Sequence, residues 1–387
     1  MTVRKLAVTM LCSTVLGLLT TNQAQAASFT FEKIVDTNSL FRIPVYEFDS
    51  PAINDEGTVA FSAAYANNQD SGTGIFSTNG KKITTIVDTN GTNGSFSSLG
   101  TPSLNNFGTV AFQGERTLNK VSGVGFFTGN GGLPATVYFD NNAKGILVSR
   151  PSINDKGTVA FADNEFGNIY INSNGKITSI ANTNGGNPVI NNQGTVSFIL
   201  PDKGLVTRNG QVTTTIANTN NLFSSLSGDG SPLNEEGTVA FLANLLSGGE
   251  GIFTGNGASL TTIADTSGDF DGFGASPAIN DDGKVAFWAF LKSGGEGIFT
   301  GSDIVKNKVI ATGDNLLDSK VTGIESFDLQ GLNNRGQIVF AASLANGTQG
   351  IYVATPENTN SVPEPSFLFG ELIVGVGAVW LRLHKHK

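Results

Sequence analysis

The stretch Ile53-Asn54-Asp55-Glu56-Gly57-Thr58-Val59-Ala60-Phe61 decides the fold, because its pattern recurs along the chain. Asn at the first and Gly at the fourth position suit a type I turn, in which the Asn side chain caps backbone N–H groups and Gly tolerates a positive φ. After the turn, Val59 and Phe61 point to one face and Ala60 to the other, the period-two pattern of a β-strand. The stretch therefore predicts a turn followed by a strand.

The Asn-x-x-Gly frame is followed seven times by a strand with a bulky face and a small face. Successive glycines of the frame are separated by 51, 49, 37, 43, 46 and 53 residues. A mean of about 46 residues holds four short strands with their turns, which is the content of one propeller blade. Bulky residues on one face and small ones on the other suit closely packed sheets. The seven turns begin at Asn54, Asn105, Asn154, Asn191, Asn234, Asn280 and Asn333.

Each unit continues with two further predicted strands, first a Gly followed by two bulky apolar residues and then an outer β-branched run, as in residues 74–76 and 83–89. The seventh unit stops at residues 351–353 without that run, and a single copy of it stands alone at residues 32–37. A ring explains both facts, because the N-terminal strand completes the last blade and leaves no sheet edge unpaired. We predict an all-β fold, a seven-bladed β-propeller over residues 27–355 closed by an N-terminal strand. An open β-rich repeat array is the alternative.

Several chemistries are excluded by composition. The chain has 387 residues, its single Cys is Cys12, and its two His are His384 and His386. The middle of the chain therefore lacks disulfides, Cys or His nucleophiles, Ser-His-Asp triads and His-ligated zinc. Residues 27–355 carry 18 Lys and Arg against 29 Asp and Glu, a net charge of about −11 that repels phosphate backbones. We do not expect nucleic acid as a partner.

One polar position, at the end of each β-branched run, is a candidate site. Carboxylates around a ring could bind calcium through oxygen ligands or include a pair that flanks a glycosidic bond. The same position also holds Asn, so we favour a local role in which these side chains close turns by accepting backbone N–H bonds. We expect no cofactor, with calcium as the alternative. The column is Asp36, Asp88, Asp140, Asn182, Asn218, Asp265 and Asp314, of which the five Asp are the candidate metal ligands.

Two further features are assigned to structure rather than to function. Trp288, the only Trp in the middle region, could be a sugar-stacking platform, but a packed or half-packed side chain is the preferred interpretation. The acidic pairs Asp281-Asp282 and Glu235-Glu236 occupy turn tips, where we expect them to be solvated.

The first 26 residues have the features of a secretory signal peptide. Arg4 and Lys5 precede an apolar stretch over residues 6–19, and Ala24 and Ala26 form the cleavage motif of signal peptidase. Cleavage after Ala26 removes Cys12 and leaves a mature protein without Cys, which suits an exported protein.

The C-terminal end begins with a polar linker at residues 356–361 and ends with a basic cluster. Between them lie the motif Val362-Pro363-Glu364-Pro365-Ser366 and an apolar run, residues 367–381, which is expected to form a transmembrane helix; the basic residues are Arg382, Lys385 and Lys387. This order of parts, over residues 362–387, resembles the PEP-CTERM sorting signal. The resemblance implies recognition by an exosortase-type sorting enzyme after export, a helix held in the inner membrane before processing, and a cytoplasmic basic tail, in agreement with the positive-inside rule. An ordinary terminal helix or a membrane anchor that is never processed is the alternative.

The repeat itself, Asn-x-x-Gly-x-Val-Ala-Phe, resembles tandem repeats of other PEP-CTERM proteins, a group that implies no defined activity. Together these features predict a non-catalytic, exported protein at the cell surface or in the extracellular matrix that binds extracellular polysaccharide or surface proteins. The alternative is a carboxylate-based glycosidase or lyase that acts on extracellular polysaccharide.

Overall fold

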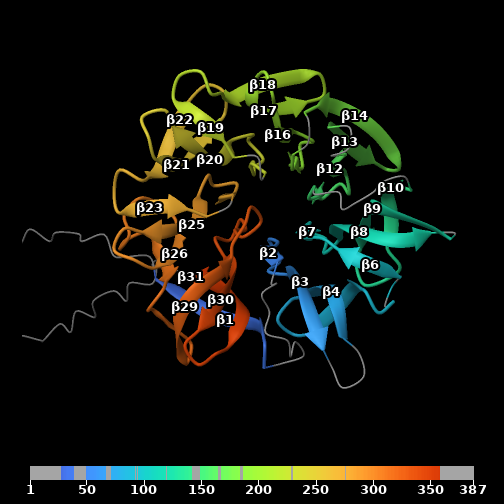
Figure 1. The fold of residues 1–387 in the computed structure, drawn as a ribbon, viewed down its shortest axis with the longest axis horizontal. Coiled ribbons are helices and arrows are strands. Elements are labelled where there is room, and N and C mark those ends of the chain that lie inside the picture. Colours follow the sequence, from blue (N-terminus) through green and yellow to red (C-terminus); the bar gives the residue numbers. More distant parts are fainter. Residues whose placement is uncertain are drawn as a thin grey trace, which may run out of the picture. The chain divides into compact units, whose positions relative to one another are not determined.

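The fold of the middle region is an all-β ring of seven sheets (Figure 1). The computed structural model describes residues 28–38, 49–66, 71–91, 93, 95–118, 120–141, 149–163, 167–183, 186–227, 230–274 and 276–357. Within these ranges every regular element is a strand, and no helix is long and apolar enough to cross a membrane. The predicted seven-bladed β-propeller is confirmed. The expected signal helix and C-terminal hydrophobic helix lie outside the described residues.

The chain divides into two compact units, and all the blades belong to the first, Met1–Pro356. In each blade neighbouring strands pair antiparallel, and in blades two and six two short strands share one neighbour. Blade one contains β2 (Asp49–Ile53), β3 (Val59–Ala66), β4 (Ser71–Thr78) and β5 (Ile83–Asp88). Blade two contains β6 (Phe96–Leu99), β7 (Ser103–Leu104), β8 (Val110–Leu118), β9 (Val121–Gly129) and β10 (Ala135–Asp140). Blade three contains β11 (Ser152–Ile153), β12 (Val159–Asp163), β13 (Asn168–Ser173) and β14 (Lys176–Asn182).

The remaining blades repeat the plan, and the seventh recruits the first strand of the chain. Blade four contains β15 (Val189–Ile190), β16 (Val196–Leu200), β17 (Gly204–Asn209) and β18 (Val212–Ala217). Blade five contains β19 (Phe223–Leu226), β20 (Val239–Leu245), β21 (Glu250–Gly255) and β22 (Leu260–Asp265). Blade six contains β23 (Phe270–Phe273), β24 (Ala278–Ile279), β25 (Val285–Leu291), β26 (Glu296–Phe299) and β27 (Lys308–Ala311). Blade seven contains β28 (Asn315–Leu316), β29 (Ser319–Ser326), β30 (Ile338–Leu344), β31 (Gln349–Pro356) and β1 (Phe29–Asp36).

The core lies between blades, where the bulky face of one sheet packs on the small face of its neighbour. Phe112 and Phe127 of blade two stack with ring centroids 5.8 Å apart, and they share a buried cluster with Ala52 and Ala60 of blade one. Burying each Phe contributes about 1.5–3 kcal/mol. The alternation of large and small residues read from the repeat is therefore the packing rule of the ring.

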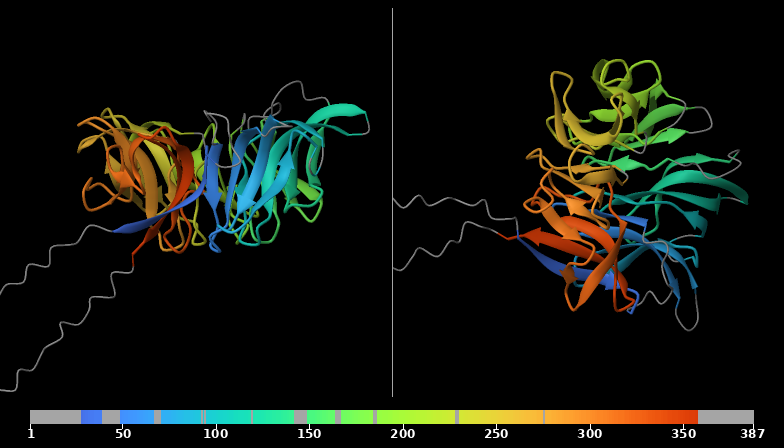
Figure 2. Two further views of the ribbon diagram at one scale, coloured as in Figure 1. Left: turned by 90° about the horizontal axis from the view of Figure 1, so that it is seen from below. Right: turned by 60° about the vertical axis from the view of Figure 1, so that its left-hand side comes forward.

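The ring closes between the two ends of the propeller. Strand β1 pairs antiparallel with β31, from Phe29 opposite Pro356 to Asp36 opposite Gly350. Figure 2 shows β1 running along the outside of the seventh blade. On the other side of this blade, Val339 and Ala341 pack in one cluster with Phe61 of blade one. The predicted closure by the N-terminal strand is confirmed.

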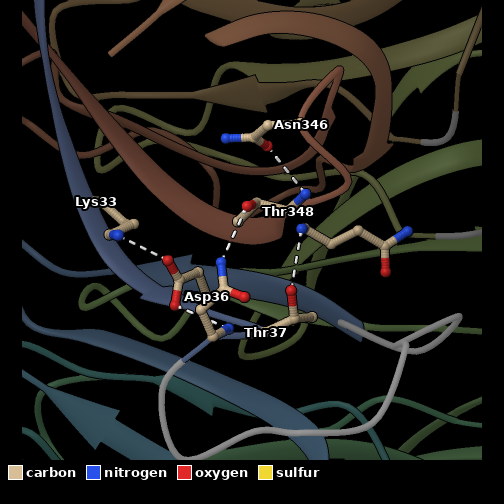
Figure 3. A network of polar contacts seen from close by, with 7 residues as sticks. Lys33, Asp36, Thr37, Asn346 and Thr348 are labelled. Atoms are coloured by element: carbon tan, nitrogen blue, oxygen red, sulfur yellow. Dashed lines mark hydrogen bonds and ion pairs between the residues drawn. The ribbon is translucent and has the colours of Figure 1, made fainter. Parts of the chain in front are cut away.

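Polar contacts fasten this closure at the end of β1 (Figure 3). The Thr37 backbone N–H donates to the Gln349 carbonyl oxygen at 2.9 Å, and the Asn38 side-chain amide donates to the Thr348 hydroxyl at 3.0 Å. The Thr348 backbone N–H donates in turn to the Asn346 side-chain oxygen at 3.0 Å. Residues more than 300 positions apart in sequence are therefore joined by both strand pairing and side chains.

Candidate functional site

The seven Asn-x-x-Gly turns meet at the axis of the propeller, near the inner ends of strands such as β2 and β7 in Figure 1. In blade three, the Asn154 carbonyl oxygen accepts the Gly157 N–H at 3.0 Å, which closes the predicted turn. The Asn154 Oδ1 atom also accepts the N–H groups of Lys156 at 3.1 Å and Thr158 at 3.0 Å. Gly157 has a φ of +72°, a conformation that costs other residues about 1–2 kcal/mol.

The first residues of the turns form a buried ring of amides, which we call the amide ring. The Nδ2 atom of one Asn donates to the backbone oxygen of the corresponding Asn in the next blade, as from Asn154 to Asn191 at 3.0 Å. Six successive pairs among the described residues carry this bond, and the link from Asn333 to Asn54, at 2.8 Å, crosses from blade seven to blade one. All members are at most 5% exposed: Asn54, Asn105, Asn154, Asn191, Asn234, Asn280 and Asn333.

The second residues of the turns form another closed ring, which we call the acid–amide ring. The backbone N–H of each member donates to a side-chain oxygen of the member in the next blade. Within the described part of the chain this gives seven bonds of 2.7–2.9 Å and no break in the circle. The members are Asp55, Asn106, Asp155, Asn192, Glu235, Asp281 and Asn334.

Carboxylates and amides mostly alternate in the acid–amide ring, and the amides hold the carboxylates together. The Asn106 Nδ2 atom lies 3.0 Å from Asp55 Oδ2 and 3.1 Å from Asp155 Oδ2. Asn334 joins Asp55 and Asp281 in the same way, at 3.0 and 2.7 Å. Hydrogen bonds to a carboxylate are stronger than those between neutral groups. The amides therefore hold the carboxyl groups of neighbouring blades in fixed positions around the axis.

A cavity of about 240 Å³ lies on the axis between the turns and the opposite ends of the inner strands. Apolar side chains of the inner strands and the polar side chains of the turns line it together, with Leu329 and Gln330 from the loop before the seventh inner strand. The lining is therefore mixed, and polar groups make up the larger part of it.

The loop carrying residues 328–330 acts as a plug at the far side of this cavity. The Gln330 side chain accepts the Leu104 N–H at 3.0 Å and donates to the Leu104 carbonyl oxygen at 3.3 Å. Asp328 is 4% exposed and forms an ion pair with Arg150, and Leu329 packs against the core of blades four and five. These contacts, together with the bond from the Ile53 N–H to the Gln330 carbonyl oxygen at 3.0 Å, hold the loop in the centre of the ring.

The sequence-predicted column of polar residues lies far from the axis. Its members end the outer strands of separate blades or, for Asn218 and Asp314, follow β18 and β27, so the structure does not bring them together. Any calcium ion bound by one of these carboxylates would have to use ligands from that residue's own surroundings. The described residues contain no group of three or more His, Cys, Asp or Glu side chains that could hold a metal ion. Calcium binding stays a prediction.

The local role of the column is visible in its hydrogen bonds. Asp88 Oδ1 accepts the backbone N–H two residues later, that of Asn90, at 3.1 Å, and Asp265 Oδ1 accepts that of Ser267 at 2.9 Å. Asp36 does the same and also binds Lys33 Nζ at 2.6 Å (Figure 3). These are the turn-closing bonds that the sequence predicts.

The residues that sequence reasoning missed are the second positions of the turns. Glu235 was expected to be solvated, which is wrong, because its Oε2 atom is buried and Oε1 accepts the Asn192 N–H at 2.9 Å. Asp281 is exposed but bonded into the same ring, and Glu236 and Asp282 are exposed as predicted. The available signal was that this position always carries a side-chain oxygen, as Asp, Asn or Glu.

The interpretation of Trp288 as a half-packed residue is confirmed. The side chain packs against the core of blades six and seven, and its Nε1 donates to Glu296 Oε2 at 3.0 Å. The cleavage motif at Ala24 and Ala26, the motif at residues 362–366 and the basic residues Arg382, Lys385 and Lys387 lie outside the described residues.

Comparison with known proteins places this chain in a family by its sequence. The model of a family of unknown function, DUF7453, matches residues 32–162 and 136–368. The chain belongs to DUF7453. The matched residues of this DUF7453 member cover the seven turns and both rings. No curated protein matches the chain.

Solved structures resemble this DUF7453 member in fold. An acylaminoacyl peptidase from Pyrococcus horikoshii matches with a TM-score of 0.51 and 12% identity, over 84% of this chain and 54% of that chain. An oligogalacturonate lyase from Vibrio parahaemolyticus matches with a TM-score of 0.49 and 11% identity, over 86% and 98% of the two chains. A virginiamycin B lyase from Staphylococcus aureus matches at 0.46 and 14%, over 85% and 100%. At such identities the likeness concerns the fold alone.

Proposed function

We propose that the protein is a non-catalytic β-propeller, exported to the cell surface or the extracellular matrix, which binds polysaccharide or surface proteins there. The observation that carries the non-catalytic part is the use of the axial side chains. Asp55, Asp155 and the amides between them are held by hydrogen bonds to one another and to backbone N–H groups. A general acid or base needs a carboxyl group within reach of substrate and ready to exchange a proton. The carboxyl groups of Asp55 and Asp155 instead hold the turns of neighbouring blades together.

The binding part of the proposal rests on the face of the ring that carries the turns. Phe107, the third residue of the second turn, is 78% exposed beside the acid–amide ring, where the other turns carry polar residues. An aromatic surface next to several oxygen acceptors is the mixture that recognises polyhydroxylated or amine-bearing ligands. We place the ligand contact on this face.

The export part of the proposal rests on the two ends of the sequence. Signal peptidase would remove residues 1–26, and an exosortase-type enzyme would act at residues 362–366 while the adjacent apolar segment is held in the inner membrane.

A test of export measures the mature ends of the protein by mass spectrometry in a host that has its sorting enzyme. We expect a new N-terminus at Ala27 and loss of Lys387, and the variant Pro363→Ala should keep Lys387. Retention of Lys387 in the unaltered chain would refute processing.

A test of binding compares the full chain with Phe107→Ala on a glycan array and on surface-protein extracts. We expect binding that falls about 2- to 13-fold in the variant, because a stacked aromatic ring contributes about 0.5–1.5 kcal/mol and a tenfold change in affinity corresponds to about 1.4 kcal/mol. Release of reducing or unsaturated sugar products from the bound polysaccharide would instead support the alternative, a carboxylate-based glycosidase or lyase.

A further inference from the structure

Seven is an odd number, and the acid–amide ring therefore cannot alternate perfectly. Reading around the ring, acids and amides take turns until Glu235 is followed by Asp281. Elsewhere in the ring an Asn separates the acids: Asn106 donates to both Asp55 and Asp155, Asn334 donates to both Asp281 and Asp55, and Asn192 donates to Asp155. At the seam between blades five and six no amide separates the two acids, and the Glu235 backbone N–H donates to the Asp281 carboxyl group.

The hydrogen bonds of this seam leave one buried oxygen without a partner. Glu235 Oε1 accepts the Asn192 N–H at 2.9 Å, and the Glu235 N–H donates to Asp281 Oδ1 at 2.9 Å. Asp281 Oδ2 accepts from Asn334 at 2.7 Å. Glu235 Oε2 is buried and has no hydrogen-bond partner among the described residues. A buried acceptor in this state costs about 1–3 kcal/mol.

The acidic groups near Glu235 raise the pKa of its carboxyl group. Asp281 follows it in the ring, and Asp155 lies on its other side beyond Asn192. Burial raises the pKa of the Glu235 carboxyl above its ordinary value of 4.5, the two neighbouring acids raise it further, and the N–H groups of Asn192 and Gln193 oppose the shift. Burial and like charge both favour the neutral acid.

We propose that Glu235 is the proton-binding site of the acid–amide ring. A proton taken from solvent onto its carboxyl group supplies at this seam the donor that Asn106 and Asn334 supply elsewhere. When the proton leaves, two adjacent carboxylates repel each other and the contact between blades five and six weakens.

The sign of the pH dependence follows from the protonation of the folded state. Because folded Glu235 holds its proton more tightly than the unfolded chain does, its seam is intact near pH 4.5 and below. Stability from this group falls as the pH rises above 4.5 and through the pKa of the folded state. The propeller would therefore be loosened at neutral pH and tightened in mildly acidic surroundings.

The test compares two variants of the full chain that each remove one negative charge from the ring. In Glu235→Gln, the amide nitrogen can donate toward Asp281 while the side-chain oxygen still accepts the Asn192 N–H. In Asp155→Asn, the new amide faces the donating nitrogens of Asn106 and Asn192 and loses both bonds. At a pH where Glu235 is ionised the change in charge is the same in both variants, and the change in hydrogen bonding is opposite.

Melting temperatures are measured between pH 4.5 and 8 for the parent chain and both variants. We expect Glu235→Gln to melt above the parent at pH 8, by a shift on the order of 1–3 °C, and to converge with it at pH 4.5. Asp155→Asn should melt below the parent at both values. A parent and a Glu235→Gln variant with parallel pH profiles, or a rise in both variants, would overturn the proposal.

A direct readout is the ¹³C carboxyl resonance of Glu235 in Glu-labelled protein, assigned by its absence in Glu235→Gln. We expect its titration midpoint above 4.5. A midpoint at or below 4.5 in the folded chain would overturn the proposal, whatever the melting temperatures show.

Discussion

Replacing Asn154 by Ala should weaken the whole propeller, because this side chain links its own turn to the next blade. Asn154 is 4% exposed, its oxygen accepts the N–H groups of Lys156 and Thr158, and its nitrogen donates to the Asn191 carbonyl oxygen. The variant leaves two N–H groups without acceptors, each at a cost of about 1–3 kcal/mol. Water can reach the N–H of Lys156 in the exposed part of the turn, so we expect a loss of about 2–4 kcal/mol.

The assay is urea unfolding followed by far-ultraviolet circular dichroism, with the free energy of unfolding extrapolated to water. Asn154→Asp separates the two roles of the side chain, because it keeps the accepting oxygen but places a second oxygen against the Asn191 carbonyl group. We expect it to be destabilised at pH 7 and less so at a pH that protonates the new carboxyl group.

The matched control is Asn244→Ala. Asn244 is exposed near the end of β20 in blade five and donates to the Ser225 hydroxyl at 2.7 Å. An exposed bond of this kind is expected to change stability by less than about 0.5 kcal/mol. If Asn154→Ala also falls within about 0.5 kcal/mol of the parent chain, the amide ring does not stabilise the propeller and the reasoning is refuted.

Three further changes probe the closure and the packing. Deletion of residues 29–36 exposes the edge of β31, so we expect dimers or aggregates in size-exclusion chromatography with light scattering; a stable monomer would contradict the closure. Gly125→Ala places a Cβ in steric conflict with the Tyr138 carbonyl oxygen and should lower the free energy of unfolding by about 3 kcal/mol or more. Gly157→Ala meets nothing within 4 Å and should lower it by about 1–2 kcal/mol, because the residue has a positive φ. Equal losses of stability in urea unfolding would refute this ranking. Burial, with a smaller effect of Asp36, raises the pKa of Tyr352 to about 12, and the Tyr352 hydroxyl has no partner among the described residues. We therefore expect Tyr352→Phe to raise the free energy of unfolding by about 1 kcal/mol and to remove the fall in stability expected of the parent chain between pH 10 and 12. An alkaline melting profile like that of the parent would contradict this prediction.

The architecture could be predicted from sequence because each of its rules is local and repeated. A turn residue such as Asn54, a positive-φ position such as Gly57 and the alternation of Val59, Ala60 and Phe61 each report their own conformation. The closure was also readable, since a missing strand at one end and a spare strand at the other have one simple solution. The repeated local pattern of the sequence was therefore sufficient to predict the fold.

The candidate site could not be predicted in the same way, because it depends on contacts between repeats. Asp55 and Asn106 are ordinary turn residues in sequence, and only the ring brings them within hydrogen-bond distance. The plug is harder still, since Gln330 and Leu104 are separated by 226 positions and no repeat relates them. Long-range pairs that occur once leave no periodic signal.

The division of labour within each turn indicates where binding specificity should lie. The side chains at the first and second positions form the hydrogen bonds of the amide ring and the acid–amide ring. Substitutions at these positions should therefore destabilise the propeller. Third positions are all exposed and differ in size and charge around the axis: Glu56, Phe107, Lys156, Gln193, Glu236, Asp282 and Arg335. A ring built from equivalent blades offers the same contact seven times unless some position breaks the symmetry, and the third positions do so on the face of the axial cavity. Substitutions there should change what is bound while the melting temperature stays the same, and substitutions one residue earlier should do the reverse.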